Sequence, residues 1–180
     1  MTLVKDPLLA AARIVLIFFI AVLGLAAAAV AIAAPTIVVF QDRVVAAFAA
    51  EGVTDAARIF PALPIVMLAI AALLALGVYF LVLLRRIVNS VGEGDPFVPV
   101  NAERLERMGW TVLAGQVLSI PIGRAVVWIA TIVADNDEHV HVGDDFGFDA
   151  GGLLLMLVLF ILARVFRRGA EMREELEGTV

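Results

Sequence analysis

The 180-residue sequence has no cysteine, only two histidines and few charged residues, which make up 17% of the chain. Without cysteine, the chain cannot form disulfides or thiolate metal sites, and it has no cysteine nucleophile. Soluble domains usually carry about 25% charged residues. Here 63% of the residues are hydrophobic and the mean hydropathy is +1.04. The composition therefore predicts an integral membrane protein with little chain left over for a soluble domain.

Apolar residues gather in four long stretches that are separated by short polar loops. A hydrocarbon core of about 30 Å needs roughly 20 helical residues, because each adds about 1.5 Å. A lone strand would leave its backbone groups unsatisfied in lipid, whereas a helix does not. We predict an all-α, polytopic membrane protein that forms a single domain over residues 1–180. Its four transmembrane helices are expected at about 8–34, 59–84, 110–134 and 150–166, the last being the shortest.

The first apolar stretch has a second interpretation as a secretory signal peptide. Lys5 precedes the apolar run, and Ala31-Ile32-Ala33 resembles a cleavage site. Signal peptides have an apolar region of about 7 to 15 residues. The run is longer than that, which favours a transmembrane helix.

Basic residues lie mainly on every second loop. With the four spans above, ten Lys and Arg residues fall on one side of the membrane and only Arg43 and Arg58 on the other. An excess of Lys and Arg marks the cytoplasmic side, so both termini are expected in the cytoplasm. The ten residues are Lys5, Arg13, Arg85, Arg86, Arg104, Arg107, Arg164, Arg167, Arg168 and Arg173.

An amphipathic outer helix is predicted between the first two spans. Pro35 should break or kink the first helix, and apolar residues then recur at helical spacing over residues 37–48. This segment lies in the membrane interface or extends the first span past the kink. Gly52 is expected to end it and Thr54 to cap the next helix. A helix that closes one end of the bundle is the simpler interpretation, and a substrate lid is the alternative.

Short helical extensions are expected on the cytoplasmic side. Residues 85–90 continue the second span, Gly92 ends it, and Gly94-Asp95-Pro96 forms a turn. Asn101 is predicted to cap the next helix. The fourth span is expected to continue as a helix through residues 165–175.

These extensions form a hypothetical surface for a soluble partner. Within it, Glu103 and Arg107 should pair at the favourable i,i+4 spacing. The candidate partner-binding residues are Glu103, Arg104, Arg107, Arg167, Arg168 and Glu171.

Several short motifs lie on the segments that this topology places in the cytoplasm. They are Leu84 to Ser90, Gly94 to Phe97, Asn101, Arg104-Leu105, Gly109-Trp110, Val165 to Gly169, Glu174-Glu175 and Thr179-Val180. Together with the four spans, they resemble a family of small bacterial membrane proteins known as domain of unknown function 2975. One departure is Arg164, where the family pattern leads us to expect an acidic residue.

The resemblance implies a location but no activity. It implies a multi-pass protein of the bacterial inner membrane, and it implies a small helix-turn-helix transcriptional regulator as a partner. A homo-oligomer remains an alternative or additional assembly.

Polar residues also occur within the third span. Placing an arginine at the bilayer centre costs at least about 2.5 to 3.5 kcal/mol, so Arg124 is expected to face the bundle interior or a wet cavity. Pro121 should kink the helix, and Gln116 lies two turns from Arg124 on a similar face. We hypothesise a polar site of Gln116, Pro121 and Arg124 for an anion, a lipid headgroup or a proton-linked substrate. In the alternative, Arg124 extends outward to the headgroups or stabilises the bundle.

The loop between the last two spans holds both histidines. His139 and His141, with Asp144 or Asp145, are weak candidates for divalent-metal ligands. A solvated acidic hairpin is the simpler interpretation, so we predict no metal and no cofactor.

Motifs for enzymatic chemistry are missing from the sequence. No serine, histidine and carboxylate come together within the spans, and no glycine-rich phosphate loop follows a strand. The basic residues lie close to the membrane, so lipid rather than nucleic acid is their expected partner. We therefore predict a non-enzymatic interaction or regulatory protein. The alternative is a small transporter or channel with a polar site around Arg124.

Overall fold

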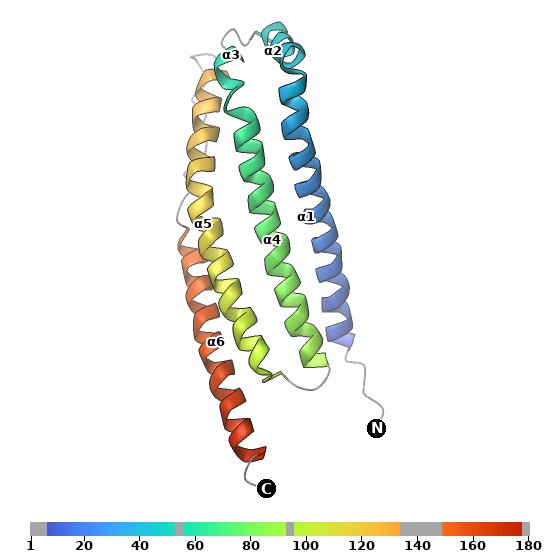
Figure 1. Ribbon diagram of the computed structural model, residues 1–180, viewed down its shortest axis with the longest axis vertical. Helices are drawn as coiled ribbons and strands as arrows, with labels where there is room; N and C mark the ends of the chain where they lie inside the picture. The colour runs from blue at the N-terminus through green and yellow to red at the C-terminus, as the bar shows by residue number, and fades with distance from the viewer. Residues whose placement is uncertain (1–6, 53–55, 93–95, 134–148, 178–180) are drawn as a thin grey trace. The chain divides into compact units, whose positions relative to one another are not determined.

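The computed structural model describes residues 7–52, 56–92, 96–133 and 149–177, and these are 93% helical with no strand among them. The described helices are α1 (Pro7–Val39), α2 (Gln41–Ala50), α3 (Ala56–Ile59), α4 (Leu63–Gly92), α5 (Pro99–Val133) and α6 (Ala150–Glu177) (Figure 1). Four of them, α1, α4, α5 and α6, are long and apolar enough to cross a membrane. The predicted all-α fold with four candidate transmembrane helices is confirmed.

The helices end close to where their sequences predict. α4 continues past Arg85 and Arg86 and ends at Gly92, and α6 continues to Glu177. α1 runs through Pro35 to Val39, so the proline does not end this helix. Phe40 separates α1 from α2, a distinct helix that begins at Gln41 and buries no residue. Gly52 follows with a φ of 92°, a left-handed conformation that glycine adopts without strain.

One predicted helix boundary is wrong. α5 begins at Pro99, so Asn101 lies inside its first turn rather than at its N-cap. Proline suits the first position of a helix because its fixed φ is helical and no partner is needed for its nitrogen. The Asn101 side chain is thereby free for another role. Thr54 and Gly94-Asp95, also given roles above, lie outside the described residues.

The described residues form two compact units. Unit 1 comprises those of Met1–Leu23, Leu76–Ala114 and Ala150–Val180, and unit 2 those of Gly24–Ala75 and Gly115–Asp149. The long helices α1, α4 and α5 contribute residues to both units. A hydrophobic cluster in unit 1 joins α4, α5 and α6 through Leu83, Ile87, Leu105, Met108, Leu159 and Ala163.

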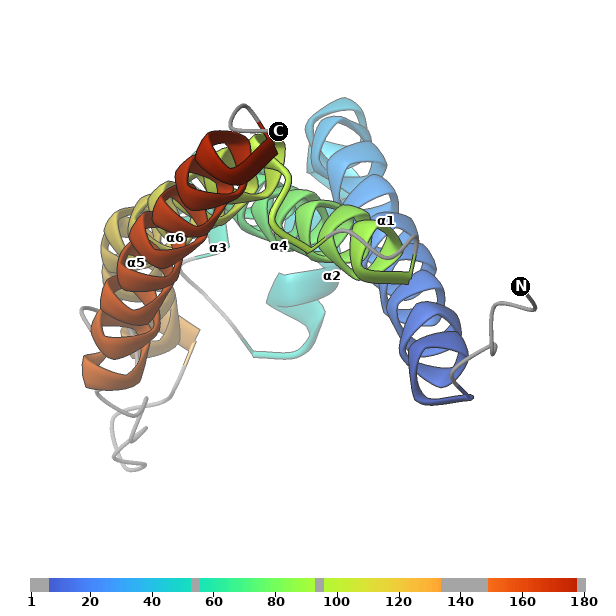
Figure 2. The ribbon, with the colours of Figure 1, turned by 90° about the horizontal axis from the view of Figure 1, so that it is seen from below.

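Within unit 1, α6 and the first part of α5 lie side by side in both views (Figures 1 and 2). The rings of Trp110 and Phe160 pack edge to face with their centroids 5.5 Å apart. Further along the same pair, Arg167 contacts Glu106. As residue numbers fall along α5 they rise along α6, so the two helices are antiparallel.

Candidate functional site

The connection between α4 and α5 in unit 1 is held by one buried amide. Asn101 is 0% exposed. Its Nδ2 donates to Ser90 Oγ at 2.7 Å and to the Pro96 carbonyl at 2.9 Å. Its Oδ1 accepts a hydrogen bond from Arg104 Nη1 at 2.9 Å. Both N–H donors and the oxygen of the amide are therefore used, as a buried polar group requires.

The same network engages Arg104. Besides Asn101, its Nη1 reaches the Arg86 carbonyl at 3.2 Å, which links α5 to α4. Arg104 is one of the predicted partner-binding residues, and its Nη1 already forms these two hydrogen bonds within the hairpin. Glu103 and Arg107 do form the predicted i,i+4 pair, with 3.6 Å between Oε2 and Nη2, and both side chains are 60% exposed.

Two glycines in unit 1 allow phenylalanine rings to pack against helix backbone. A Cβ at Gly169 would lie 2.7 Å from the Phe97 ring, and one at Gly109 would lie 3.1 Å from the Phe160 ring. The Phe97 ring also packs on Phe166, with 5.3 Å between centroids. Glycine at these positions therefore sets how closely α6 approaches α5 and the residues before it.

Another glycine brings α1 to the end of α4. The guanidinium of Arg13 lies where a Cβ of Gly92 would be, and the Leu9 side chain is next to it. The last carbonyls of a helix lack intrahelical partners and carry partial negative charge. Arg13 thus places a cation where the C-terminus of α4 favours one.

A cleft lies between α5 and α6 in unit 1. Its volume is about 360 Å³, and it is lined by Glu106, Phe160, Ala163, Arg164, Arg167, Arg168 and Glu171. Arg167 Nη2 donates to Glu106 Oε2 at 2.7 Å across the cleft. Arg167, Arg168 and Glu171 were predicted from the sequence as partner-binding residues, whereas Glu106 and Arg164 were not predicted as site residues. Their proximity depends on the register of α6 against α5, which residue spacing along one helix does not reveal.

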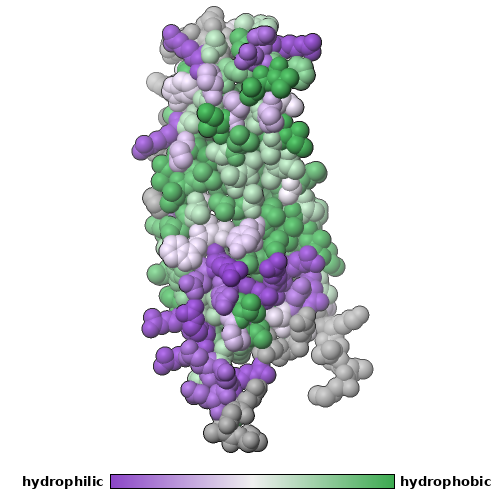
Figure 3. All heavy atoms as spheres, in the orientation of Figure 1, coloured by the Kyte–Doolittle hydropathy of each residue, from purple (hydrophilic) through white to green (hydrophobic). Residues whose placement is uncertain are grey.

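Aromatic residues of the kind that is enriched at the headgroup level are exposed on helices α4 and α5. Trp110 is 58% exposed and Tyr79 is 43% exposed, and such residues are enriched at the level of the headgroups. Trp128, 44% exposed, follows Trp110 by 18 residues along α5, about 27 Å, which is close to the hydrocarbon thickness. Over unit 1, hydrophilic side chains gather at the lower helix ends with apolar ones above them (Figure 3).

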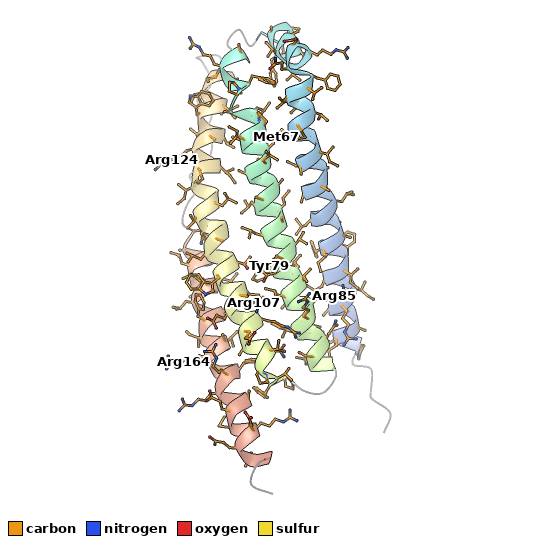
Figure 4. All side chains as sticks on the ribbon, viewed as in Figure 1. Met67, Tyr79, Arg85, Arg107, Arg124 and Arg164 are labelled. Carbon is orange, nitrogen blue, oxygen red and sulfur yellow. The ribbon has the colours of Figure 1, made fainter. Side chains whose placement is uncertain are left out.

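The hypothetical polar site in the third span is not assembled. Gln116 is buried, but its amide is paired with the backbone of Asp149, the residue before α6. Nε2 donates to the Asp149 carbonyl and Oε1 accepts from its N–H, both at 2.9 Å. Arg124 is exposed and points outward from α5 (Figure 4). Arg124 was expected to face the bundle interior or a wet cavity, and its exposure contradicts the first of these two expectations.

The exposed position of Arg124 agrees with the alternative interpretation. Arg124 lies four residues, about 6 Å, from Trp128 along α5, within reach of the headgroups for an extended arginine. Pro121, the third member of the hypothetical site, is exposed within an uninterrupted α5. The candidate metal ligands His139, His141, Asp144 and Asp145 lie outside the described residues, so that hypothesis stays a prediction.

A comparison with protein families matches residues 44–180 to the family described as "Protein of unknown function (DUF2975)". The chain belongs to this family. The DUF2975 match begins within α2 and includes α4, α5 and α6, while α1 precedes it. No curated protein and no solved structure matches the chain.

The DUF2975 resemblance drawn from the sequence rests largely on residues that shape unit 1. Asn101 and Ser90 belong to the buried network, and Gly109 and Gly169 accommodate phenylalanine rings. Phe97 is one of those rings. These motif residues therefore have structural roles in unit 1.

Proposed function

We propose that this DUF2975 chain is a non-enzymatic membrane protein that binds a soluble regulatory protein through the end of α6. The supporting observation is the length of that helix. α6 continues for eight residues past Gly169, the residue that packs against Phe97, and eight helical residues extend about 12 Å. We call residues 170–177 the α6 extension.

The α6 extension combines an apolar stripe with negative charge. Met172 and Leu176 are 56% and 72% exposed, and their spacing places them on one helix face. Both lie beyond Arg167 and Arg168, so lipid chains do not cover them if these arginines mark the membrane surface. Three acidic residues and one arginine flank Met172 and Leu176 in the sequence: Glu171, Arg173, Glu174 and Glu175.

This pattern fits a partner that has an apolar groove edged with basic residues. Amphipathic helices dock into such grooves through residues at i and i+4. A small helix-turn-helix transcriptional regulator is our candidate, because the family resemblance implies one and DNA-binding proteins carry basic surfaces. The proposal places the α6 extension in the cytoplasm, in keeping with the distribution of Lys and Arg.

The proposal is tested by photo-crosslinking in native membranes of the source cells. A photoreactive residue replaces Met172 in one variant and Leu25, which is 74% exposed within the apolar part of α1, in a control. We expect a specific soluble protein at position 172 and not at position 25. Binding of that purified protein should then be lost in Met172→Glu with Leu176→Glu, a change that keeps good helix formers.

Three outcomes of these experiments would overturn the proposal. Recovery of only lipids and copies of the chain at position 172, or of the same proteins at both positions, contradicts it. Unchanged binding of the purified protein to the double variant also contradicts it. Thermal unfolding of the variant, which alters only exposed side chains, serves as the folding control.

A transport function around Arg124 receives less support. The Arg124 side chain is exposed, and the Gln116 amide is already paired with Asp149. We therefore do not propose it. Solute flux into liposomes that Arg124→Ala abolishes would reverse this conclusion.

A further inference from the structure

The cleft between α5 and α6 holds more guanidinium groups than carboxylates. Arg164, Arg167 and Arg168 face two acids, Glu106 and Glu171, so the lining has one excess positive charge. Arg167 is paired with Glu106 at 2.7 Å. Arg164 and Arg168 form no ion pair with the described residues. They are four residues apart on α6, a spacing at which like charges repel. An anion between them would relieve that repulsion.

The walls of the cleft change from apolar to basic along α6. Phe160 and Ala163 form the apolar wall, and Phe160 packs on the exposed ring of Trp110. The arginines follow within two turns. If Trp110 lies at the headgroup level, where tryptophan is enriched, the apolar wall faces the hydrocarbon and the arginines lie among the phosphates. Figure 4 shows Arg164 on the outer side of α6, where a lipid can reach it.

We propose that this cleft binds the phosphate group of an anionic phospholipid, with Arg164 and Arg168 as its ligands. The planar guanidinium presents paired N–H donors that match phosphate oxygens. The first carbons of the acyl chains pack along Phe160 and Trp110. The volume of about 360 Å³ suits a headgroup. A zwitterionic lipid would return a cation to a lining that already carries excess positive charge, so phosphatidylglycerol is favoured over phosphatidylcholine.

The chain supplies a matched control for general attraction between arginine and anionic lipid. Arg85 and Arg86 are also exposed near one end of a membrane-spanning helix, but neither lines the cleft. Replacing either pair by glutamine removes the same charge. Only the Arg164 and Arg168 pair should affect a specific lipid site.

The test is native mass spectrometry of the purified full chain, titrated with phosphatidylglycerol or phosphatidylcholine. We expect Arg164→Gln with Arg168→Gln to weaken phosphatidylglycerol binding about tenfold, the scale of a lost charge-assisted contact. Arg85→Gln with Arg86→Gln should change it less than about twofold, and phosphatidylcholine should bind all forms weakly. Thermal unfolding confirms that each variant is folded, since all four arginines are exposed.

Three results would overturn the proposal. They are undiminished phosphatidylglycerol binding in the cleft variant, an equal loss in the Arg85 and Arg86 variant, and equal affinity of the wild type for both lipids. Inorganic phosphate forms a separate arm. If it raises the unfolding temperature of the wild type but not of the cleft variant, while phosphatidylglycerol has no effect, the ligand is free phosphate and not lipid. The purified chain contains no protein partner, so failure here leaves the proposed function untouched.

Discussion

Unit 1 and unit 2 are built partly from the same long helices, yet they are held together differently. Unit 1 combines a hydrophobic cluster with the buried Asn101 network and the Arg167–Glu106 contact. In unit 2, α2 buries no residue, and Gln116 ties α5 to Asp149 by two hydrogen bonds. Burying apolar surface stabilises helix packing where water is the alternative, but gains little where lipid is. Polar contacts should therefore matter in both units, and apolar packing more in unit 1.

Among the variants that test this contrast, Asn101→Ala is expected to lower the free energy of unfolding most. Removing the amide takes one hydrogen bond each from Ser90, the Pro96 carbonyl and Arg104, of which Ser90 and Arg104 keep a bond to a backbone carbonyl of α4. Unsatisfied buried groups cost about 1–3 kcal/mol each, so we expect the free energy of unfolding to fall by about 3 kcal/mol. Chemical unfolding in detergent measures it. Asn89→Ala is the control, because the half-buried Asn89 side chain forms no hydrogen bond with the described residues. Equal losses would contradict the role of the network.

A smaller loss is expected from Gln116→Leu in unit 2. Leucine fills a similar volume but leaves the N–H and carbonyl of Asp149 without the amide, at a cost of about 2 kcal/mol. Hydrogen exchange should rise at the first turn of α6, around Ala150 to Leu153. Gln41→Leu, on the exposed surface of α2, should leave that exchange unchanged. Unaltered exchange in Gln116→Leu would show that unit 2 does not depend on this polar link.

Glycine substitutions compare a tight contact with an open one. Gly169→Ala would place a methyl group 2.7 Å from the Phe97 ring, and we expect a net loss of about 1 kcal/mol after the gain in helix propensity. At Gly77 the nearest atom, on Leu23, is 3.9 Å away. Gly77→Ala should therefore be neutral or slightly stabilising. Thermal unfolding of both variants measures the difference, and equal unfolding temperatures would contradict close packing at Gly169.

The smallest effect is expected for the ion pair between Arg167 and Glu106. Their side chains are 56% and 44% exposed, so solvent screens the attraction despite the 2.7 Å distance. A double-mutant cycle with Arg167→Ala and Glu106→Ala should give a coupling below about 1 kcal/mol. A coupling of several kcal/mol would mean that this contact, and not the Asn101 network, dominates the polar stabilisation of unit 1.

Hydropathy along the chain predicted the elements well. The four apolar helices, the continuation of α4 to Gly92 and that of α6 past Arg168 all follow from residue order. Those features depend on helix propensity and on local breakers, which act within a few residues. The continuation of α1 through Pro35 was one of the two interpretations that the sequence left open.

The direction of polar side chains was harder to predict. Asn101 was assigned to a cap but bridges α4 and α5. Arg124 was expected to face the bundle interior or a wet cavity, and it is exposed. A cap and a buried bridge need the same residue type, so the sequence cannot separate them without the position of Ser90. Glu106 was missed for a similar reason, since only the pairing of α5 with α6 brings it to Arg167.

The pairing of Gln116 with Asp149 has a consequence for motion. The side-chain amide offers one donor and one acceptor, and a single backbone residue takes both. A helical step of one residue is about 1.5 Å in height and about 100° in direction, so a change in the register of Gln116 against Asp149 breaks both bonds together. Gln116 therefore holds Asp149 in a single register, because the two hydrogen bonds form together or are lost together.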